Sequence, residues 1–447
     1  MAFPTLTFNA STGSDVAASG AGPAIALSGA AAATTAASPT VDLSVDAPDL
    51  SGVATDGSAV IWVDSSSGRQ FSAIIAVDNI LKTVTAANNY ANTEGARNWG
   101  IGGKRPTWND ADSRRIFIDS SAAWTIQTET DQTITATTIT FSAAGDTTSG
   151  SIIVQGTSVA PRPIINITAN AAIFTMSGTG VKYKDLQFTN SNATKTNANV
   201  VSSGSGISVG FINCIIGDST NQLESAYVRT GNNQSYQFAD CEINNCTSFG
   251  ISNGVNAGTI LVVGCSIHNN GAGGISGSTG GPGMRIFDSI IWANVGSGYT
   301  SSTGSLTLIG NTIHGNTGAA ADGVNLTSSA ASNLIVYNNN ITGNGRYGLN
   351  TPTSGDMTKI LVNNNNYGSG STANGSGAVN NITLGAESIT VDPAYVSAAT
   401  GDFRVGVTVA SKGFPLDPRT IGGNTSLTNS FTDIGASQRR PPPPFII

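Results

Sequence analysis

One short phrase recurs eight times between Leu186 and Asn364, and it constrains the fold more than any other feature of this 447-residue chain. Each phrase has an apolar residue, a variable residue that is usually Asn, Asp or Gly, a small or polar residue that we call the anchor, and then a variable and an apolar residue. The anchors are Leu186, Cys214, Cys241, Cys265, Ser289, Asn311, Asn339 and Asn364. Their spacing of 22 to 28 residues is typical of a solenoid, in which each repeat forms one coil.

A second marker, a Gly followed by an apolar residue, recurs in phase with the anchors. It occurs at Gly250-Ile251, Gly274-Ile275, Gly298-Tyr299, Gly323-Val324 and Gly348-Leu349. Within each repeat, apolar residues alternate over short runs rich in Ile and Val, which is typical of strands. The patterns of helical and leucine-rich repeats are not found in the sequence. The repeat therefore predicts an all-β fold, a right-handed parallel β-helix whose coils stack about 4.8 Å apart.

Three columns of side chains are expected to fill the interior of the coils. The residue two after the anchor gives Phe188, Ile216, Ile243, Ile267, Ile291, Ile313, Ile341 and Asn366. The residue three before the anchor gives Tyr183, Phe211, Phe238, Val262, Ile286, Leu308, Val336 and Leu361. The anchors form the third column, which passes from Leu through three Cys and a Ser to three Asn. Stacked Asn amides can satisfy one another, because each donates to one neighbour and accepts from the other.

The composition limits the partners of the chain. Charged residues make up only 11% and the net charge is −7, whereas ordinary domains have roughly 25% charged residues. Sparse Lys and Arg argue against nucleic acid as a partner. No apolar run of about 18 residues exists, so no membrane-spanning helix is expected. The N-terminal residues lack the basic and apolar regions of a secretory signal peptide, so export is not expected.

The four cysteines are interpreted as buried thiols. Cys214, Cys241 and Cys265 share the anchor column, where stacking would place Cβ atoms about 4.8 Å apart. That separation exceeds the roughly 3.5–4.5 Å of a disulfide. Cys246 lies at a turn without a His partner. A Cys-based metal site is the alternative interpretation, but neither a metal nor another cofactor is expected.

Five regions are expected along the chain. Residues 1–45, rich in Ala, Ser, Thr and Gly, predict an extended, low-charge arm that drapes over a neighbour rather than folding alone. Residues 46–125 hold strand-like runs and predict a small β-rich head domain. Residues 126–366 are expected to form the parallel β-helix and residues 367–438 its C-terminal cap. Residues 439–447 form a Pro-rich tail, which is either a docking peptide held out in an extended conformation or a disordered end.

The sequence that follows the last repeat resembles the closing segment of pectate-lyase-like right-handed β-helix proteins. The residues that carry the resemblance are Asp392-Pro393, Gly401-Asp402-Phe403-Arg404, Ser411-Lys412-Gly413 and Asp433-Ile434-Gly435-Ala436. In that superfamily such an ending caps the open end of the last coil. The resemblance covers about residues 150–438 and implies the fold but no activity, because the superfamily includes lyases, hydrolases, adhesins and bacteriophage surface proteins. The chain looks most like bacteriophage virion surface proteins, which implies a homotrimer.

Catalytic candidates are sparse. A polysaccharide-cleaving β-helix needs carboxylates grouped on one outer face. Asp240 and Asp288 occupy the position before the anchor, two coils apart, which corresponds to about 9.6 Å. The same column also contains Asn and Gly, the mixture that tight bends select, so a bend role is favoured over a catalytic one.

An outward stripe of aromatic residues is the second candidate site. The residue three after the anchor includes His268, Trp292, His314 and Tyr367, and by strand alternation it points away from the Ile column. Such a stripe could contact another subunit or bind a glycan. The two His residues are expected about 10 Å apart, too far to share a metal ion.

These observations favour a non-enzymatic bacteriophage structural protein on the virion surface, assembled in the host cytoplasm as capsid decoration or a tailspike. Its expected partners are other virion proteins of the capsid or tail, further copies of itself, and a cell-surface polysaccharide. A polysaccharide depolymerase, either lyase or hydrolase, is the first alternative, and a secreted bacterial adhesin is the second. The sequence leaves open the capsid or tail location, the copy number, the glycan, any catalytic activity and the role of the Pro-rich tail.

Overall fold

The structure is a computed structural model that forms two compact units, residues 1–223 and residues 224–447, each described by itself below. It describes residues 5–8, 27–43, 50, 53, 55, 60–65, 68–87, 89–90, 93–101, 104–105, 115–119, 124–128, 131–135, 139–144, 151–156, 161–177, 180–194, 200–202, 208–220, 222–229, 235–253, 259–277, 283–302, 305–327, 333–352, 359–368, 373–383, 385 and 387–405.

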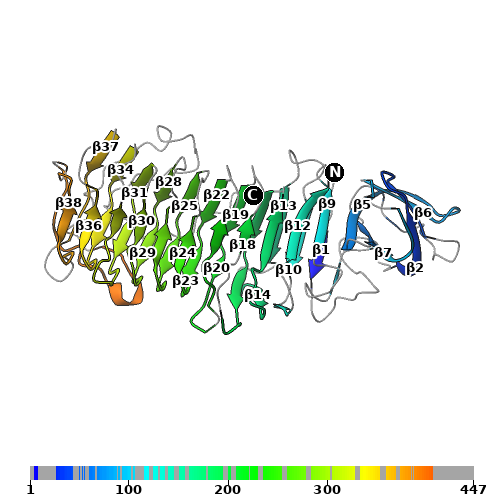
Figure 1. Ribbon diagram of the computed structural model, residues 1–447, viewed down its shortest axis with the longest axis horizontal. Coiled ribbons are helices and arrows are strands. Elements are labelled where there is room, and N and C mark those ends of the chain that lie inside the picture. Colours follow the sequence, from blue (N-terminus) through cyan, green and yellow to red (C-terminus); the bar gives the residue numbers. More distant parts are fainter. Residues whose placement is uncertain are drawn as a thin grey trace. The chain divides into compact units, whose positions relative to one another are not determined.

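The second unit is a parallel β-solenoid whose successive coils pair in register (Figure 1). Sheet 1 stacks β22 (Ser235–Ala239), β25 (Ile260–Val263), β28 (Met284–Phe287), β31 (Leu306–Ile309), β34 (Asn333–Tyr337) and β37 (Lys359–Asn363). Sheet 2 stacks β23 (Glu242–Asn244), β26 (Ser266–His268), β29 (Ile290–Trp292), β32 (Thr312–His314) and β35 (Asn340–Thr342). Sheet 3 stacks β24 (Phe249–Ser252), β27 (Gly273–Ser276), β30 (Tyr299–Ser301), β33 (Val324–Leu326), β36 (Tyr347–Asn350) and β38 (Gly377–Asn380), and β21 (Tyr227–Arg229) precedes β24 in the chain. The all-β solenoid predicted from the repeat is confirmed.

The first unit also contains parallel coils, and they begin earlier than residue 126. One of its sheets stacks β8 (Lys104–Arg105), β1 (Thr5–Phe8), β10 (Trp124–Thr128), β13 (Ser151–Gly156), β16 (Gly180–Lys184) and β19 (Ser208–Ile212). Another stacks β11 (Gln132–Ile134), β14 (Ile164–Ile167), β17 (Gln187–Asn190) and β20 (Ile215–Ile216). A third contains β9 (Arg115–Asp119), β12 (Ile139–Ala144), β15 (Phe174–Ser177) and β18 (Val200–Ser202).

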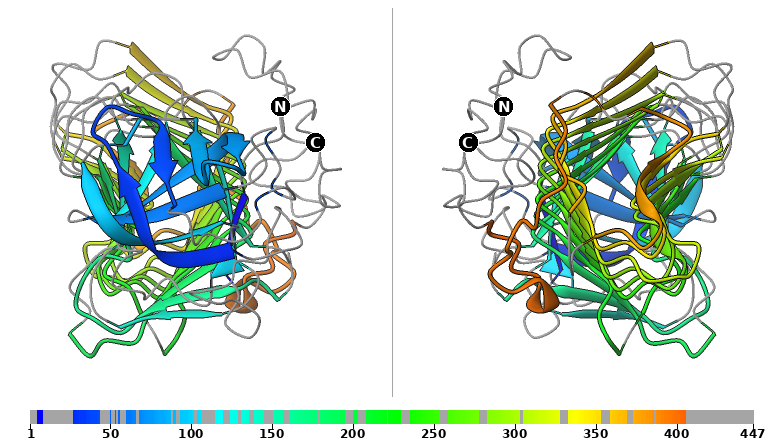
Figure 2. Two further views of the ribbon diagram at one scale, coloured as in Figure 1. Left: turned by 90° about the vertical axis from the view of Figure 1, so that its right-hand side faces the viewer. Right: turned by 90° about the vertical axis from the view of Figure 1, so that its left-hand side faces the viewer.

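A closed antiparallel barrel forms the rest of the first unit (Figure 2). Its strands are β2 (Leu27–Thr34), β3 (Thr40–Asp42), β4 (Val60–Ser65), β5 (Gly68–Asp78), β6 (Thr83–Ala86) and β7 (Glu94–Ile101). They pair in the order β5-β4-β7-β2-β3-β6, and the β5–β6 pairing closes the ring. Closure leaves no free sheet edge. The barrel is filled by Ala32, Val41, Leu43, Leu50, Val53, Ile61, Val63, Ile74, Val84, Ala86, Tyr90, Trp99 and Ile101.

The barrel corrects two predicted boundaries. The described strands of residues 1–45, which the sequence predicts as an arm, pair with other elements: β1 pairs with β10, and β2 and β3 are strands of the barrel. The head predicted at 46–125 therefore extends from β2 to β7, and β9 and β10 already pair with solenoid strands. The error has a physical cause: small residues such as those of β2 suit a tightly packed antiparallel ribbon, but they lack the apolar alternation that marks a strand in sequence.

Two buried ladders of polar side chains hold the coils of the second unit together. Beside the anchors, a second ladder runs through Cys246, Asn270, Asn294, Asn316, Asn344 and Asn374. Each Asn Oδ1 accepts from the backbone N–H and, except at the first step, from the side-chain amide of the preceding coil, as in the 2.9 Å bond from Asn294 Nδ2 to Asn316 Oδ1. Cys246, which does not belong to the anchor column, is thus the first member of this second ladder.

The recurring glycines fit against this second ladder. A Cβ placed on Gly298 would lie 2.6 Å from Ile313 Cγ2 and 3.0 Å from Asn316 Nδ2. Such contacts are shorter than real Cβ contacts, so the column requires Gly for close approach between coils. The Gly that recurs in phase with the anchors therefore stands where the backbone lies too close to the interior columns for a larger residue.

The register of the last coil differs from the prediction by one residue. Asn339 donates to Asn365 rather than Asn364. Val362, 7% exposed, fills the column assigned to Leu361, which is 49% exposed. Tyr367 rather than Asn366 therefore follows Ile341 along the Ile column. The cause is the run of four asparagines at 363–366, in which the sequence does not distinguish the bend from the anchor.

Candidate functional site

The outward stripe predicted on sheet 2 exists, and its members stand in register. His268 pairs with Trp292 across β26 and β29, Trp292 pairs with His314 across β29 and β32, and His314 pairs with Thr342 across β32 and β35. Each side chain projects from the same strand position in successive coils. The three rings are half-buried rather than exposed, so another part of the molecule covers them.

Two rings of the stripe, those of His268 and Trp292, turn their faces toward each other. The centroids of His268 and Trp292 are 4.7 Å apart and their planes differ by 23°, a separation close to the spacing of neighbouring strands. Stacked rings of this kind present their edges to the outside, whereas a sugar ring packs on an aromatic face. This stacked pair therefore presents ring edges rather than a flat ring face, and the two alternatives for the stripe, subunit contact and glycan binding, stay predictions.

Residues 389–405, which we call the C-terminal strap, cover the stripe (orange in Figures 1 and 2). The strap starts at a parallel bridge between Ile389 and Asn366 and then crosses the coils toward earlier repeats. Tyr395 packs against His314 with ring centroids 5.2 Å apart. Phe403, fully buried, packs edge-on against His314 at 5.4 Å and Trp292 at 5.6 Å. The strap therefore places its own aromatic rings on the exposed edges of the stripe.

A tight turn in the strap explains the Gly-Asp-Phe-Arg motif. Ser397 and Asp402 exchange backbone hydrogen bonds around the short helix η3 (Ala398–Thr400). Gly401 has φ 80°, and a Cβ there would lie 2.9 Å from Trp292 Cζ2. The Asp402 carboxylate accepts from Arg404 Nε at 2.9 Å, and both side chains flank Phe403 in the chain. The turn thus points Phe403 into the stripe and keeps the charged pair at the surface.

Tyr367 is not part of the outward stripe. Its side chain is 1% exposed and follows Ile341 in the inward column, because the register of the last coil is shifted by one residue. Burial raises the pKa of its phenol. The prediction that Tyr367 contributes to a contact surface is therefore wrong.

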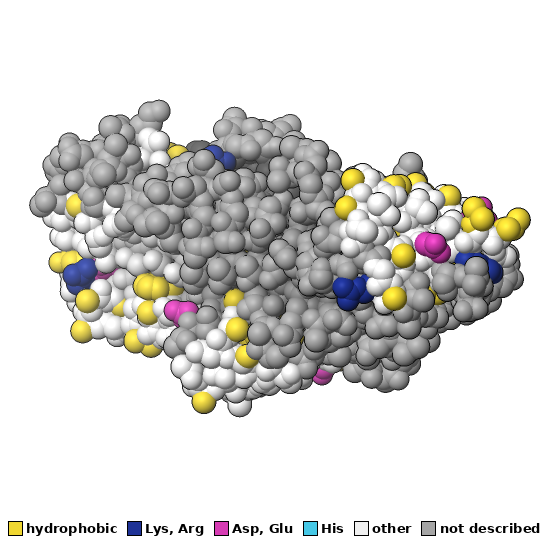
Figure 3. Space-filling model, turned by 45° about the vertical axis from the view of Figure 1, so that its right-hand side comes forward, with side chains coloured by type: hydrophobic (Ala, Val, Ile, Leu, Met, Phe, Trp, Pro, Cys, Tyr) yellow, Lys and Arg dark blue, Asp and Glu magenta, His cyan; other side chains and the backbone are white. Residues whose placement is uncertain are grey.

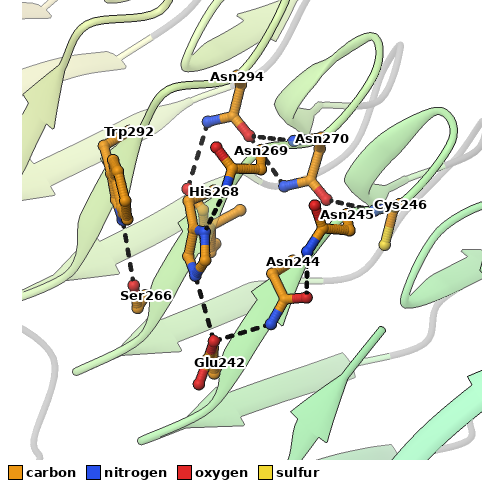
Figure 4. A network of polar contacts seen from close by, with 11 residues as sticks. Glu242, Asn244, Asn245, Cys246, Ser266, His268, Asn269, Asn270, Trp292 and Asn294 are labelled. Carbon is orange, nitrogen blue, oxygen red and sulfur yellow. Dashed lines mark hydrogen bonds and ion pairs between the residues drawn. The ribbon is translucent and has the colours of Figure 1, made fainter. Parts of the chain in front are cut away.

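A polar network surrounds the other end of the stripe (Figure 4). Glu242 Oε1 accepts from Asn244 Nδ2 at 2.8 Å and lies 3.3 Å from His268 Nε2. Asn269 Nδ2 lies 3.1 Å from His268 Nδ1. An amide nitrogen can only donate, so Nδ1 accepts and Nε2 carries the proton toward Glu242. The Glu242 side chain remains 45% exposed, which makes it the exposed carboxylate of this network.

In the sequence Glu242 is one of several scattered acids and is not a candidate, because it belongs to a neighbouring column. It stands two residues before Asn244 on β23, and it reaches His268 only because the next coil brings β26 alongside. Phe403 and Tyr395 were missed as site residues for a similar reason, since nothing in the sequence indicates that the cap returns across sheet 2.

Asp240 and Asp288 occupy bends, as the favoured interpretation predicted. Their φ values are 53° and 48°, and Gly264 and Gly310 occupy the same column with φ 64° and 71°. Asn, Asp and Gly tolerate this left-handed conformation better than other residues. Among the described residues, no group of three or more His, Cys, Asp or Glu side chains is placed to hold a metal ion.

The cysteines described here are free thiols. Cys214, Cys241, Cys246 and Cys265 are all buried. Burial raises the pKa of Cys246 to about 12.

In the part of the chain that the structure describes, no helix is long and apolar enough to cross a membrane. The Pro-rich tail, Ser411-Lys412-Gly413 and Asp433-Ile434-Gly435-Ala436 lie outside the described residues.

Comparison with known proteins identifies the coil type. Residues 198–367 match the family model described as the right-handed β-helix region. The coils form a right-handed β-helix. No curated protein sequence matches the chain.

Three solved structures that are similar to the chain are distant in sequence. Pectate lyase Pel9A is 14% identical with a TM-score of 0.45, over 71% of this chain and 88% of that one. The periplasmic alginate epimerase AlgG is 12% identical with a TM-score of 0.41, over 62% and 76%. The tailspike protein gp49 from Pseudomonas phage LKA1 is 12% identical with a TM-score of 0.22, over 87% and 62%.

Proposed function

We propose that the protein is a structural surface protein of a bacteriophage particle, in which the β-helix serves as a rod. The observation that carries this proposal is the covered outer face of sheet 2. The His268 and Trp292 rings there stack face to face, and Phe403 of the strap is completely buried against Trp292 and His314. A face that packs against its own chain stabilises the coils and is not built to receive a ligand.

The interior of the second unit supports a rod. Two ladders of hydrogen-bonded side chains run from coil to coil, so each coil fixes the register of the next. On the face drawn in Figure 3, few of the described side chains are charged, in line with the 11% charged residues of the whole chain. Such a surface suits lasting contacts with other proteins better than steering toward a charged substrate.

The particle assignment rests on the resemblance of Asp392-Pro393 and Gly401-Asp402-Phe403-Arg404 to the closing segment of pectate-lyase-like β-helix proteins, a superfamily that includes bacteriophage surface proteins. We extend the proposal to a homotrimer whose barrels, residues 27–101, attach to capsid or tail proteins. The closed barrel offers no sheet edge for strand addition, so attachment would use its loops and outer surface.

Purified particles test this proposal. Mass spectrometry of density-purified particles is expected to detect the chain in constant ratio to the major capsid protein, and labelled antibody is expected to decorate the particle surface. Light scattering of the isolated protein is expected to give three times the 45.1 kDa chain mass. A protein found only in the soluble fraction of lysed host cells would contradict the particle assignment, and a stable monomer would contradict the trimer.

A polysaccharide-cleaving enzyme is the second candidate, and one observation favours it. The Glu242 carboxylate is oriented by Asn244 and His268 and is still 45% exposed, so it could act as a general base toward a bound glycan. Incubation of micromolar protein with host capsule, followed by measurement of viscosity and new chain ends, distinguishes the candidates. Cleavage that is lost in Glu242→Gln but kept in Asp240→Asn would favour the enzyme; unchanged glycan with the unsubstituted protein would remove it.

A further inference from the structure

We propose that the C-terminal strap is an acid-sensitive clasp, closed at neutral pH and opened when His314 takes up a proton. The proposal is independent of where in a particle the protein resides. It rests on the position of His314 between the strap and the body of the β-helix, where one titratable ring contacts both.

His314 is the ring on which the strap converges. Tyr395 and Phe403 approach it from the strap at 5.2 and 5.4 Å, and the two strap rings pack on each other at 5.0 Å. On the side of the body, His314 Nδ1 forms a 2.9 Å hydrogen bond with Thr342 Oγ1, which in turn lies 3.2 Å from the Tyr395 hydroxyl. A Cβ on Gly343 would lie 2.8 Å from His314 Cε1, so the ring also packs on that backbone.

The surroundings of His314 disfavour a positive charge. Its described neighbours are aromatic rings, a hydroxyl and glycine backbone, and no described carboxylate pairs with it. The nearby charged groups are engaged elsewhere: Glu242 pairs with His268, and Asp402 on the strap pairs with Arg404. The Asp392 carboxylate accepts from the Ala394 N–H, and its charge helps to raise the pKa of the Tyr395 hydroxyl. A protonated His314 would therefore be half-buried without a paired counter-charge, which is unfavourable.

The direction of the pH effect follows from this burial. Desolvation lowers the pKa of His314 below its ordinary value of 6.5 while the strap is closed. When the strap is open the ring is hydrated and the pKa returns toward that value. The open form therefore binds protons more readily as the pH falls below about 6.5, and the closed form loses stability over that range down to the lowered pKa.

Opening would uncover specific surfaces. Phe403 would leave the edges of Trp292 and His314, and Gly401 would move off Trp292. The polar contacts of the strap with the coils include the pairing of Ile389, the bond from the Val391 N–H to Asn366 Oδ1 and the contact between the Tyr395 hydroxyl and Thr342 Oγ1, whereas the bonds between Ser397 and Asp402 lie within the strap itself. A local change at one side chain can therefore release the strap without unfolding the coils.

Hydrogen exchange read by mass spectrometry tests the clasp in the full-length protein. Exchange times are scaled for the intrinsic pH dependence of exchange, and peptides covering 392–405 are compared with peptides from β26 and β29. Between pH 7.5 and pH 5.0, strap protection in the unsubstituted protein is expected to fall by about tenfold, with no change in β26 and β29. In His314→Gln, which stays neutral and can still bond Thr342, protection is expected to change less than about twofold.

Two further variants make the outcome decisive. His268→Gln is the matched control and is expected to keep the fall in protection, while Phe403→Ala is expected to show low protection at both pH values. An equal fall in the unsubstituted protein and in His314→Gln would overturn the proposal, as would no fall at all. Should His314→Gln fail to fold, the pH midpoint of the unsubstituted protein decides: a midpoint near 4, where carboxylates titrate, would also overturn it.

Discussion

At the anchor positions, three chemically different side chains meet one requirement. Cys241 Sγ, Ser289 Oγ and Asn339 Nδ2 each donate to the backbone carbonyl two residues earlier, at 3.3, 2.8 and 2.9 Å. After Leu186, the column therefore selects a small side chain with a donor rather than a particular residue, which explains why Cys gives way to Ser and then Asn along the repeat. Asn and Ser anchors also bond to the preceding coil, because Asn339 Oδ1 accepts from the Asn311 N–H and Ser289 Oγ accepts from the Cys265 N–H.

Exchange of one anchor type for another tests this requirement. We expect Cys265→Ser to change the free energy of unfolding by less than about 1 kcal/mol, because a hydroxyl can make the bond to Val263 O now made by the thiol. Cys265→Val keeps the volume but removes the donor, and is expected to cost about 1–2 kcal/mol more than Cys265→Ser. Denaturant titration measures both. Equal losses would show that size alone matters at this position.

The interior of the second ladder is expected to be less tolerant. In Asn316→Leu, the backbone N–H of Asn294 loses the acceptor that it now has at 3.2 Å, and the ladder is interrupted on both sides. We expect a loss of about 3 kcal/mol, since a buried donor is left without a partner. Asn333→Leu, on an exposed position of β34, is the control and is expected to stay within about 0.5 kcal/mol. Thermal or denaturant unfolding of both variants gives the comparison.

At the scale of elements, the sequence specifies the coils well but leaves the strap hidden. Alternation and the two markers predict the strand columns, because inward positions need apolar side chains and bends need Asn, Asp or Gly. The prediction fails at Asn363 to Asn366, where identical residues occupy different positions. The motif around Phe403 indicates a cap, yet its path back over Trp292 depends on a tertiary contact that no local pattern encodes.

The turn that aims Phe403 offers a matched test of the strap. Gly401 and Gly315 both have positive φ, 80° and 62°, but a Cβ on Gly315 would meet nothing within 4 Å, whereas one on Gly401 would meet Trp292. Gly315→Ala is expected to cost about 1 kcal/mol from backbone strain alone. Gly401→Ala adds the collision, so strap amides should exchange markedly faster in hydrogen-exchange measurements. Equal behaviour of the two variants would mean that the strap does not depend on this contact.

At the scale of the whole molecule, a solenoid is stabilised by contacts between neighbouring coils. Its ends have a neighbour on one side only, so an end cap matters more than its size suggests. In the second unit the strap caps the last coil through two sets of contacts. Ile389 pairs with Asn366 of the last coil, and Tyr395 and Phe403 pack against His314 and Trp292 of earlier coils. The repeat in the sequence shows where coils exist, but the stability of the last coil is determined by residues outside the repeat.

Removal of the strap's aromatic rings should therefore produce a gradient along the coils rather than uniform loss. In the double variant Tyr395→Ala and Phe403→Ala, amides of β37 and β35 should exchange fastest, those of β32 less so, and those of β26 and β25 as in the unsubstituted protein. The order follows because each coil is held by its neighbours, so disruption at one end weakens with distance. Hydrogen exchange at several times measures the gradient, and Val396→Ala, at an exposed strap position, is the control that should leave it absent. Simultaneous loss of protection in every coil would show that the second unit unfolds as one cooperative body and that the strap stabilises all of it equally.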